Sequence, residues 1–332
     1  MITPALLVDR GRLEANIAAM AATMARAGVA LRPHFKTSKS LEVARLQAEA
    51  GAVGFTCATA AEVDALLQAG HRDLFWAHAP VGPKAGLAAD FNRRGRVIVA
   101  VDSAELVDAL APDIPVRIEV DTGLGRTGVA ADDVPALARR ILDRGLELDG
   151  VYTFEGQVYA AEDRSAVAER AAAELVTVAE RLRADGIPVP TVSVGSTPGA
   201  ASAPLVRGVT EARPGTYVFA DAGQVRLGSQ RLEDCALAVA ATVIRVRGDE
   251  AVVDAGTKAL GSERAPDGTF GMVPELGASV TAAWEEHGLI SGAPGLRVGD
   301  VVRIVPNHAC VTVNMWSAMR AGGQTWATVA RR

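Results

Sequence analysis

Between about residues 10 and 220, short runs of β-branched and other apolar residues alternate with longer, alanine-rich amphipathic runs. The apolar runs predict strands at Val29–Pro33, Val53–Cys57, Asp73–His78, Val97–Val101, Val116–Val120, Leu148–Phe154 and Thr191–Gly195. The amphipathic runs predict helices at Leu13–Ala27, Leu41–Ala50, Ala60–Ala69, Ala104–Leu110, Val134–Arg144 and Ala166–Asp185. Seven or eight such strand–helix units in about 210 residues favour an α/β fold of the (β/α)8 TIM-like barrel type over an open sheet.

The pattern changes after residue 225, where short apolar runs are separated by Gly, Pro and charged turns and no helix of any length is expected. The strands predicted there are Val239–Arg247, Ala251–Asp254, Leu296–Val305 and Cys310–Trp316. A further strand, Ala5–Val8, precedes the barrel pattern and is placed with this C-terminal β-rich domain. The predicted domains are therefore residues 9–225 for the barrel, and residues 1–8 with 226–332 for the β-rich part.

Composition narrows the classes of function. The chain of 332 residues is 49% hydrophobic, enough for a sizeable core, and its net charge of −5 argues against nucleic-acid or anionic-membrane partners. Its apolar stretches are broken well short of the ~20 residues that span a bilayer, and Met1-Ile2-Thr3-Pro4 does not resemble a signal peptide. Three widely spaced cysteines (Cys57, Cys235, Cys310) do not form a disulfide framework, and we expect a cytoplasmic protein.

Lysine chemistry has few candidates, because only four of the 34 basic residues are lysines. One of them, Lys36, lies in the segment Arg32-Pro33-His34-Phe35-Lys36-Thr37-Ser38-Lys39, which follows the first predicted barrel strand. Catalytic residues of such barrels lie at the carboxyl ends of strands, where a desolvated lysine can form a Schiff base with an aldehyde cofactor. The alternative is a surface lysine near a helix start, and the clustering with His34, Thr37 and Lys39 favours the catalytic interpretation.

Two glycine-flanked segments come late in the barrel pattern, the first at the strand predicted over Thr191–Gly195 and the second after the next strand along the chain. They are Ser193-Val194-Gly195-Ser196-Thr197-Pro198-Gly199 and Arg213-Pro214-Gly215-Thr216-Tyr217. Backbone N–H groups and hydroxyls in such segments can bind a phosphate, and phosphate sites recur after strands seven and eight of these barrels. Each segment alone is compatible with an ordinary turn, and together they predict a phosphate site.

Two further segments carry charged or metal-binding side chains. Glu119 to Gly128 ends another strand, and there Arg126 either reaches a cofactor oxygen or forms an ion pair with Asp121. In Pro306-Asn307-His308-Ala309-Cys310, a strand would place the His308 imidazole beside the Cys310 thiol, a nitrogen–sulfur pair that suits Zn²⁺. A histidine and a cysteine with this spacing, and with no further ligand motif nearby, do not usually form a metal site.

With these segments in place, the sequence resembles the D-threonine aldolase / D-serine dehydratase family, a branch of the alanine-racemase-like (fold type III) pyridoxal-phosphate enzymes. The resemblance covers nearly the whole chain, in order. It includes R-P-H-x-K-T, E-V-D-T-G-x-x-R-x-G, R-P-G-x-Y, Val253 to Leu260, Glu286-His287-Gly288 and P-N-H-x-C.

The resemblance implies a role for each matching residue. Lys36 is the residue that binds pyridoxal 5'-phosphate and acts in catalysis, and His308 with Cys310 binds a divalent metal, Zn²⁺ in preference to Mn²⁺. Arg126 corresponds to a residue beside the phenolic oxygen of the cofactor, and Arg213 to an arginine that faces the ring nitrogen in racemases. The remaining residues implied in cofactor binding are His34, Tyr152, Ser196, Thr197, Gly215, Thr216 and Tyr217.

The chain also departs from the family pattern. Relatives usually carry His where Ser38 stands and His or Tyr near Phe154, so the neighbouring Glu155 becomes a candidate for substrate handling. The aldolases commonly have Asp where Cys310 stands, whereas the dehydratases have Cys, and the spacing from Tyr152 to Tyr159 also favours the dehydratases.

The resemblance therefore predicts a pyridoxal-phosphate- and metal-dependent lyase acting on D-3-hydroxy amino acids, with D-serine-type dehydration ahead of D-threonine-type aldol cleavage. A racemase is less expected, because the partner-chain tyrosine that racemases use is missing from the C-terminal part. A non-catalytic cofactor carrier is less expected because such carriers lack a second domain. By analogy with fold type III enzymes, we also expect a homodimer.

Overall fold

The computed structural model describes residues 1–329 and divides the chain into two compact units. Unit 1 comprises Met1–Ala18, Thr37–Leu46 and Thr216–Arg332, and unit 2 comprises Ala19–Lys36 and Gln47–Gly215. Two helices, α1 (Arg10–Ala27) and α2 (Leu41–Glu49), contribute residues to both units.

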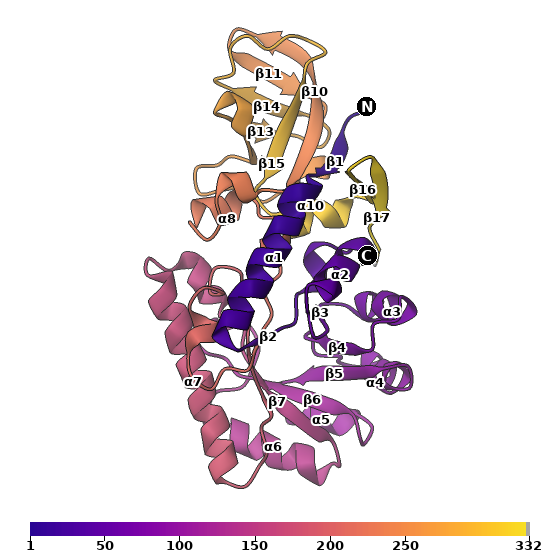
Figure 1. Cartoon of the computed structure of the whole chain (residues 1–332), viewed down its shortest axis with the longest axis vertical. Helices are drawn as coiled ribbons and strands as arrows, with labels where there is room; N and C mark the ends of the chain where they lie inside the picture. Colours follow the sequence, from indigo (N-terminus) through magenta and orange to yellow (C-terminus); the bar gives the residue numbers. More distant parts are fainter. Residues whose placement is uncertain (330–332) are drawn as a thin grey trace. The chain divides into compact units, whose positions relative to one another are not determined.

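Unit 2 is built on an eight-stranded parallel sheet in the order β2-β9-β8-β7-β6-β5-β4-β3. Figure 1 labels six of these strands, β2 to β7. Its strands are β2 (Ala30–Leu31), β3 (Phe55–Cys57), β4 (Asp73–Trp76), β5 (Arg96–Val101), β6 (Pro115–Glu119), β7 (Glu147–Tyr152), β8 (Thr191–Val194) and β9 (Glu211–Ala212). A parallel bridge between His34 and Thr56 joins the two ends of the sheet, with the Thr56 amide donating to the Pro33 carbonyl at 2.9 Å. The predicted TIM-like barrel is confirmed as a curled parallel sheet with short strands at its seam.

Helices cover this sheet because their apolar faces pack against the outward-facing strand residues. They are α3 (Ala60–Gln68), α4 (Lys84–Asn92), α5 (Ala104–Ala109), α6 (Val134–Asp143) and α7 (Arg164–Ala184). The core between the layers contains fully buried valines such as Val99, Val116, Val151 and Val192. The sequence pattern missed α4, whose run of Lys84 to Asn92 has small residues and little separation of apolar and polar faces.

Unit 1 contains a nine-stranded sheet in the order β11-β14-β13-β12-β15-β10-β1-β16-β17. Because β11 also pairs with β10, six of these strands form a closed antiparallel barrel. The strands are β1 (Ala5–Val8), β10 (Leu237–Arg247), β11 (Glu250–Val253), β12 (Gly271–Val273), β13 (Ala278–Ala283), β14 (Gly288–Ser291), β15 (Val301–Pro306), β16 (Ala318–Ala321) and β17 (Gln324–Ala327). The predicted β-rich C-terminal part is confirmed, and Ala5–Val8 is a strand that pairs with β10 and β16.

The prediction that this part has no helix, and that Cys310–Trp316 is a strand, was wrong. The chain forms α9 (Thr257–Leu260) and α10 (Ala309–Met315) there, while α8 (Ala222–Arg226) lies at the boundary before it. The β-branched residues Val311, Thr312 and Val313 favour a strand locally, but the buried Asp221 carboxylate accepts the first helical amide, that of Ala309, at 2.9 Å. The Thr312 hydroxyl also donates to the Leu260 carbonyl at 2.7 Å, so tertiary contacts override the local preference.

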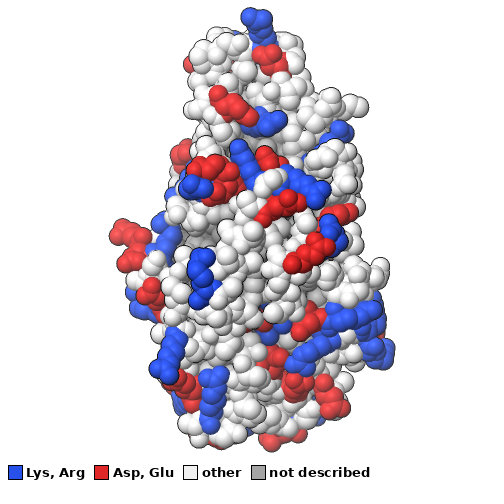
Figure 2. Space-filling model, in the orientation of Figure 1, with Lys and Arg blue, Asp and Glu red and all other residues white. Residues whose placement is uncertain are grey.

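Basic and acidic side chains are interspersed on the face of the molecule shown in Figure 2. None of the helices within residues 1–329 is long and apolar enough to cross a membrane.

Candidate active site

Lys36 lies five residues after the first strand of the parallel sheet, β2. It is in a single 3₁₀ turn, Phe35–Thr37, that follows the carboxyl end of β2, and its neighbour Phe35 is fully buried. The half-buried Lys36 Nζ lies 5.8 Å from the centre of the Phe154 ring. Phe154 comes two residues after β7, so two strand ends bring the lysine and the aromatic ring together.

Arg126 lies on the same aromatic ring. Its guanidinium carbon is 5.1 Å from the centre of Phe154, whereas the carboxylate of Asp121 accepts the backbone amides of Gly123 and Gly125 at 3.0 Å each. The hydrogen bond from Gly125, together with those of the neighbouring loop amides, lowers the pKa of Asp121. Of the two alternatives for this loop, the Asp121–Arg126 ion pair is not formed among the described residues. Arg126 instead lies over the ring of Phe154, the same ring that lies near Lys36.

The loop after β8, predicted to bind a phosphate, is held by the carboxylate of Glu155, the residue that the sequence made a candidate for substrate handling. The buried Glu155 accepts a hydrogen bond from the Gly195 amide at 3.1 Å and from the Ser196 hydroxyl at 2.8 Å. The Gly199 amide in turn donates to the Ser196 hydroxyl at 3.0 Å. A Cβ atom at Gly199 would lie 2.8 Å from both Glu155 Oε1 and Ser196 Oγ, which explains why glycine stands there.

This arrangement shows which groups in unit 2 fit a phosphate. The Ser196 hydroxyl is already used by Glu155 and Gly199, but the backbone N–H groups of Ser196 and Gly215 donate to no acceptor within residues 1–329. Ser196 follows β8 and Gly215 follows β9, and these strands are neighbours in the sheet. Unused backbone donors at adjacent strand ends are the groups that bind a phosphate dianion, so the residues fit the cofactor.

Arg213 is buried and held entirely by neutral acceptors. Its guanidinium donates to the Ser193 hydroxyl, to the Val194 carbonyl at 3.1 Å and to the Thr153 carbonyl at 2.7 Å. Burial lowers the pKa of Arg213, although the negative charges of Glu211 and Glu155 act to raise it. The guanidinium carbon also lies 5.0 Å from the centre of the Tyr152 ring.

Three other predicted cofactor residues, Tyr152, His34 and Thr197, belong to unit 2. The buried Tyr152 donates its hydroxyl to Glu119 at 2.9 Å, and burial together with Glu119 raises its pKa well above the usual value, so the phenol is neutral. His34 is half-buried and its backbone amide donates to the Pro214 carbonyl at 3.0 Å. Thr197 is buried in the loop that contains Ser196.

Thr216 and Tyr217 begin the next 3₁₀ turn, Thr216–Val218, and belong to unit 1. Both side chains are buried, and the Tyr217 carbonyl accepts a hydrogen bond from Gln230 at 2.9 Å. The Thr216 hydroxyl lies 3.9 Å from the sulfur of Cys310, which links this turn to the predicted metal pair.

The predicted metal pair is formed in unit 1, by a helix start rather than by a strand. His308 is the N-cap of α10 and Cys310 is its second residue. The His308 Nδ1 atom is 2.7 Å from Glu263 Oε2, and the Thr37 hydroxyl is 3.2 Å from Cys310 Sγ. Burial lowers the pKa of His308, but hydrogen bonds to Cys310 and Glu263 raise it to about 11.

The donor set of this pair fits a divalent metal. Glu263 occupies Nδ1 of His308, which leaves Nε2 as the nitrogen that can bind an ion, and Cys310 supplies sulfur. Within residues 1–329, no group of three or more His, Cys, Asp or Glu side chains is arranged to hold a metal. A metal on this pair would therefore keep coordination positions open for water or substrate, as in catalytic sites.

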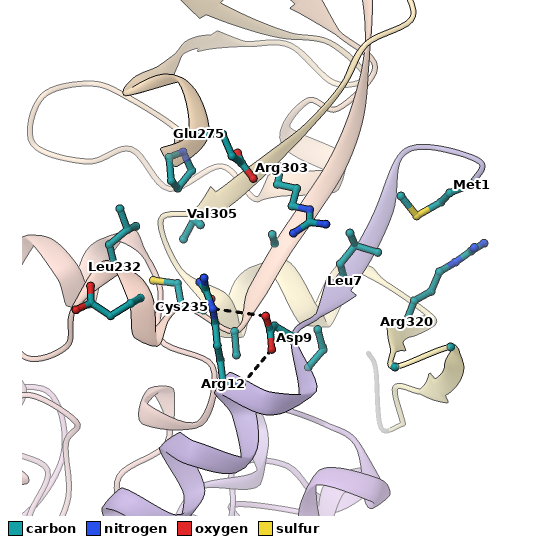
Figure 3. A pocket seen from close by; sticks show the side chains of 17 residues that line it. Met1, Leu7, Asp9, Arg12, Leu232, Cys235, Glu275, Arg303, Val305 and Arg320 are labelled. Atoms are coloured by element: carbon teal, nitrogen blue, oxygen red, sulfur yellow. Dashed lines mark hydrogen bonds and ion pairs between the residues drawn. The ribbon is translucent and has the colours of Figure 1, made fainter.

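A separate cavity of about 780 Å³ in unit 1 includes none of the predicted site residues in its lining (Figure 3). Apolar residues such as Leu7, Val8 and Val305 line it, and the side-chain hydrogen bonds among its lining residues involve the start of α1, where Arg12 also donates to the Cys235 carbonyl at 3.1 Å. There the Asp9 carboxylate accepts the Arg12 amide at 3.1 Å and lies 3.5 Å from the Arg12 guanidinium. These contacts cap a helix, so we assign no chemistry to this cavity.

Two protein-family models match the chain, one in its N-terminal and one in its C-terminal part. The model for the N-terminal domain of alanine racemase matches residues 8–222, and the model for a putative serine dehydratase domain matches residues 236–321.

Individual relatives cover nearly the whole chain. The D-threo-3-hydroxyaspartate dehydratase of Delftia sp. (strain HT23) is 39% identical over 98% of this chain and 96% of its own length. The D-threonine aldolase of Arthrobacter sp. is 34% identical over 94% of this chain and 87% of its own length. The solved structure of the Delftia dehydratase has a TM-score of 0.92 and 38% identity, covering 99% of this chain and 97% of that one. A Cys-to-Ala mutant of a D-threo-3-hydroxyaspartate dehydratase has been solved in a metal-free form, with a TM-score of 0.91 and 37% identity to this chain.

Proposed function

The chain belongs to the family defined by the alanine racemase N-terminal domain, in combination with a serine dehydratase domain, and on this premise we propose that it dehydrates D-3-hydroxy amino acids. The enzyme is a pyridoxal-phosphate-dependent lyase. The proposed products are a 2-oxo acid and ammonia, formed from a substrate that carries its hydroxyl group on the β-carbon.

The observation that carries the proposal is the position of Lys36 at the end of the first barrel strand, in the same unit as the unused amides of Ser196 and Gly215. Lys36 is suited to hold the aldehyde of the cofactor, and the two amides are suited to hold its phosphate. When bound, pyridoxal phosphate withdraws electrons from the α-carbon of an amino acid. Once the amine of the substrate has replaced that of Lys36 on the aldehyde carbon, the released Lys36 amine would serve as the base that removes the α-proton.

A divalent metal is part of the proposal, with Zn²⁺ favoured over Mn²⁺ because one of the two donors is a thiolate. His308 and Cys310 would hold it, and its chemistry would be to polarise the substrate's β-hydroxyl group as a Lewis acid. Cys310 also favours dehydration over aldol cleavage, since the dehydratases of the family have Cys at this position and the aldolases commonly have Asp. D-threonine-type cleavage to glycine and an aldehyde is the second candidate, supported by the 34% identity to the Arthrobacter aldolase.

The same proposal covers assembly and location. We place the protein in the cytoplasm because its three cysteines are free thiols, as expected in a reducing compartment. We also propose a homodimer by analogy with fold type III enzymes, which a solution mass of about twice the 34.4 kDa chain would support.

A product assay separates the two candidate reactions. The holoenzyme is incubated with zinc and with D-serine, D-threonine or D-threo-3-hydroxyaspartate, and their L-isomers serve as controls. We expect 2-oxo acid and ammonia from at least one D-isomer and no product from the L-isomers. Glycine together with an aldehyde would instead establish the aldolase reaction.

Labelling tests the role of Lys36 directly. Borohydride reduction followed by peptide mapping should place the cofactor on Lys36, and Lys36→Ala should abolish the visible absorbance of the bound cofactor. Lys84→Ala, which removes an exposed lysine, is the matched control and should retain the absorbance. A cofactor label on any other lysine would contradict the proposal.

A further inference from the structure

The two predicted metal ligands are both held by hydrogen-bonding partners that lie outside the family motif around them. His308 Nδ1 is 2.7 Å from the carboxylate of Glu263, and Cys310 Sγ is 3.2 Å from the hydroxyl of Thr37. All four residues belong to unit 1. We propose that Glu263 and Thr37 are positioning residues for the metal, Glu263 by orienting the His308 ring and Thr37 by hydrogen-bonding to the Cys310 sulfur.

Hydrogen bonds to both the backbone and the side chain of Glu263 hold it in position for this role. Its backbone carbonyl accepts a hydrogen bond at 3.0 Å from the amide group of Asn307, the residue before His308. Asn307 itself is held by Arg226, which donates to the Asn307 side-chain oxygen at 2.8 Å. The segment that carries His308 is therefore docked onto the segment that carries Glu263, and the carboxylate–imidazole contact is part of a built arrangement.

The contact between Glu263 and His308 determines which ring nitrogen of His308 can bind the metal. A carboxylate at Nδ1 favours the tautomer with the proton on that atom, so that the lone pair of Nε2 points toward the ion. Such outer partners typically contribute 10–100-fold to metal affinity. The Glu263 side chain is 52% exposed and that of His308 is 38% exposed, so the pair adds little to folding stability. Its main effect is therefore expected on metal binding.

Thr37 acts on the other ligand. It is fully buried and directly follows Lys36 in the chain, and its hydroxyl can donate to the sulfur once Cys310 is a thiolate. A hydrogen bond to a thiolate removes electron density from the sulfur and therefore changes the strength of the metal–sulfur bond. Valine at this position keeps the shape of the side chain and removes the donor, whereas serine keeps the donor.

The inference rests on the metal site of the proposed function, and a zinc titration separates the two. Metal-free full-length protein is titrated with zinc in competition with a chromophoric chelator. We expect wild-type protein to bind zinc, Glu263→Ala to bind 10–100-fold more weakly, and Glu263→Gln to lie between them because its amide still offers an acceptor. Glu275→Ala, which removes another exposed glutamate of unit 1, should bind as the wild type does.

Two outcomes would overturn the role of Glu263. One is unchanged zinc affinity in Glu263→Ala, and the other is a loss of affinity accompanied by an equal loss of urea stability in the metal-free protein, which would indicate a structural role. If wild-type protein binds neither zinc nor manganese, the metal site itself is wrong and the inference fails with it.

Cobalt substitution provides the readout for Thr37. The thiolate-to-cobalt charge-transfer band of the wild-type protein should shift in Thr37→Val and return to its original position in Thr37→Ser. An unchanged band in Thr37→Val would refute the hydrogen bond to the ligand.

Discussion

At the scale of single residues, the sequence points to candidate reactive groups but not to the residues that hold them in place. Lys36, Ser196, His308 and Cys310 stand in short motifs whose residue types indicate their chemistry. Glu263 could not be found in this way, because it contacts His308 from 45 residues away and stands in no motif. Glu155 was noticed only as a departure from the family pattern, and the structure shows it holding the loop of Ser196.

The sequence also gives no sign of the ion network inside the barrel, in which Glu211 pairs with two arginines. Its buried carboxylate accepts from Arg32 Nε at 2.7 Å, from Arg117 and from the Ser193 hydroxyl. Burial raises the pKa of Glu211, but Arg117 and Arg32 outweigh burial and hold it far below its usual value. Charged residues of this kind are spread over distant strands, so only the fold reveals that they are paired.

Glu211→Gln should destabilise the protein because it leaves two buried guanidiniums without their shared charge. We expect a loss on the order of 3–5 kcal/mol near neutral pH. Because folding depresses the pKa of Glu211, its stabilising effect is complete above the unfolded value of about 4.5 and is lost as the pH falls below it. The difference between wild type and variant, measured by urea unfolding, should therefore be constant at neutral pH and shrink below about pH 4.5.

Glu147→Gln is the control for this prediction. Glu147 pairs with Arg96 at 2.8 Å, but its side chain is 52% exposed, so its loss should cost less than about 1 kcal/mol. Equal losses in the two variants would contradict the importance of burial.

At the scale of elements, prediction succeeded where the hydrophobic pattern is long and failed where short elements depend on distant contacts. Every barrel helix predicted from the sequence is present, and the strand predictions differ from the structure mainly at their ends. In unit 1, the pattern missed the short strands β12, β13, β14, β16 and β17. It also assigned α10 as a strand, because the acceptor that starts this helix, Asp221, is distant in the sequence.

Asp221→Ala should therefore cost more than the loss of an ordinary helix cap. The buried carboxylate accepts the amides of Gln224, at the start of α8, and of Ala309, at the start of α10. Two buried donors would lose their acceptor, for an expected loss on the order of 2–4 kcal/mol in urea unfolding of the metal-free protein. Asp163→Ala removes an exposed cap of α7, which accepts only the Ala166 amide, and should cost about 1 kcal/mol. Similar losses in both variants would refute the double role of Asp221.

At the scale of the whole molecule, the metal ion and the cofactor that the fold is suited to bind depend on different parts of the chain. The predicted metal ligands His308 and Cys310 belong to unit 1, whereas Lys36 and the amides of Ser196 and Gly215 belong to unit 2. A ligand that binds only the folded protein stabilises it by mass action. The stabilisation by zinc and the stabilisation by pyridoxal phosphate should therefore be separable by mutation.

Thermal unfolding tests this separation. Zinc at 100 times its dissociation constant should contribute about 2.7 kcal/mol and raise the melting temperature by roughly 4 °C. His308→Ala and Cys310→Ala should lose the response to zinc and keep the response to pyridoxal phosphate, since neither residue lies among the groups of unit 2 that are suited to hold the cofactor. Lys36→Ala should show the opposite pattern. An undiminished zinc response in His308→Ala would place the metal elsewhere in the molecule, and the loss of both responses in one variant would show that the two ligands bind as a single unit.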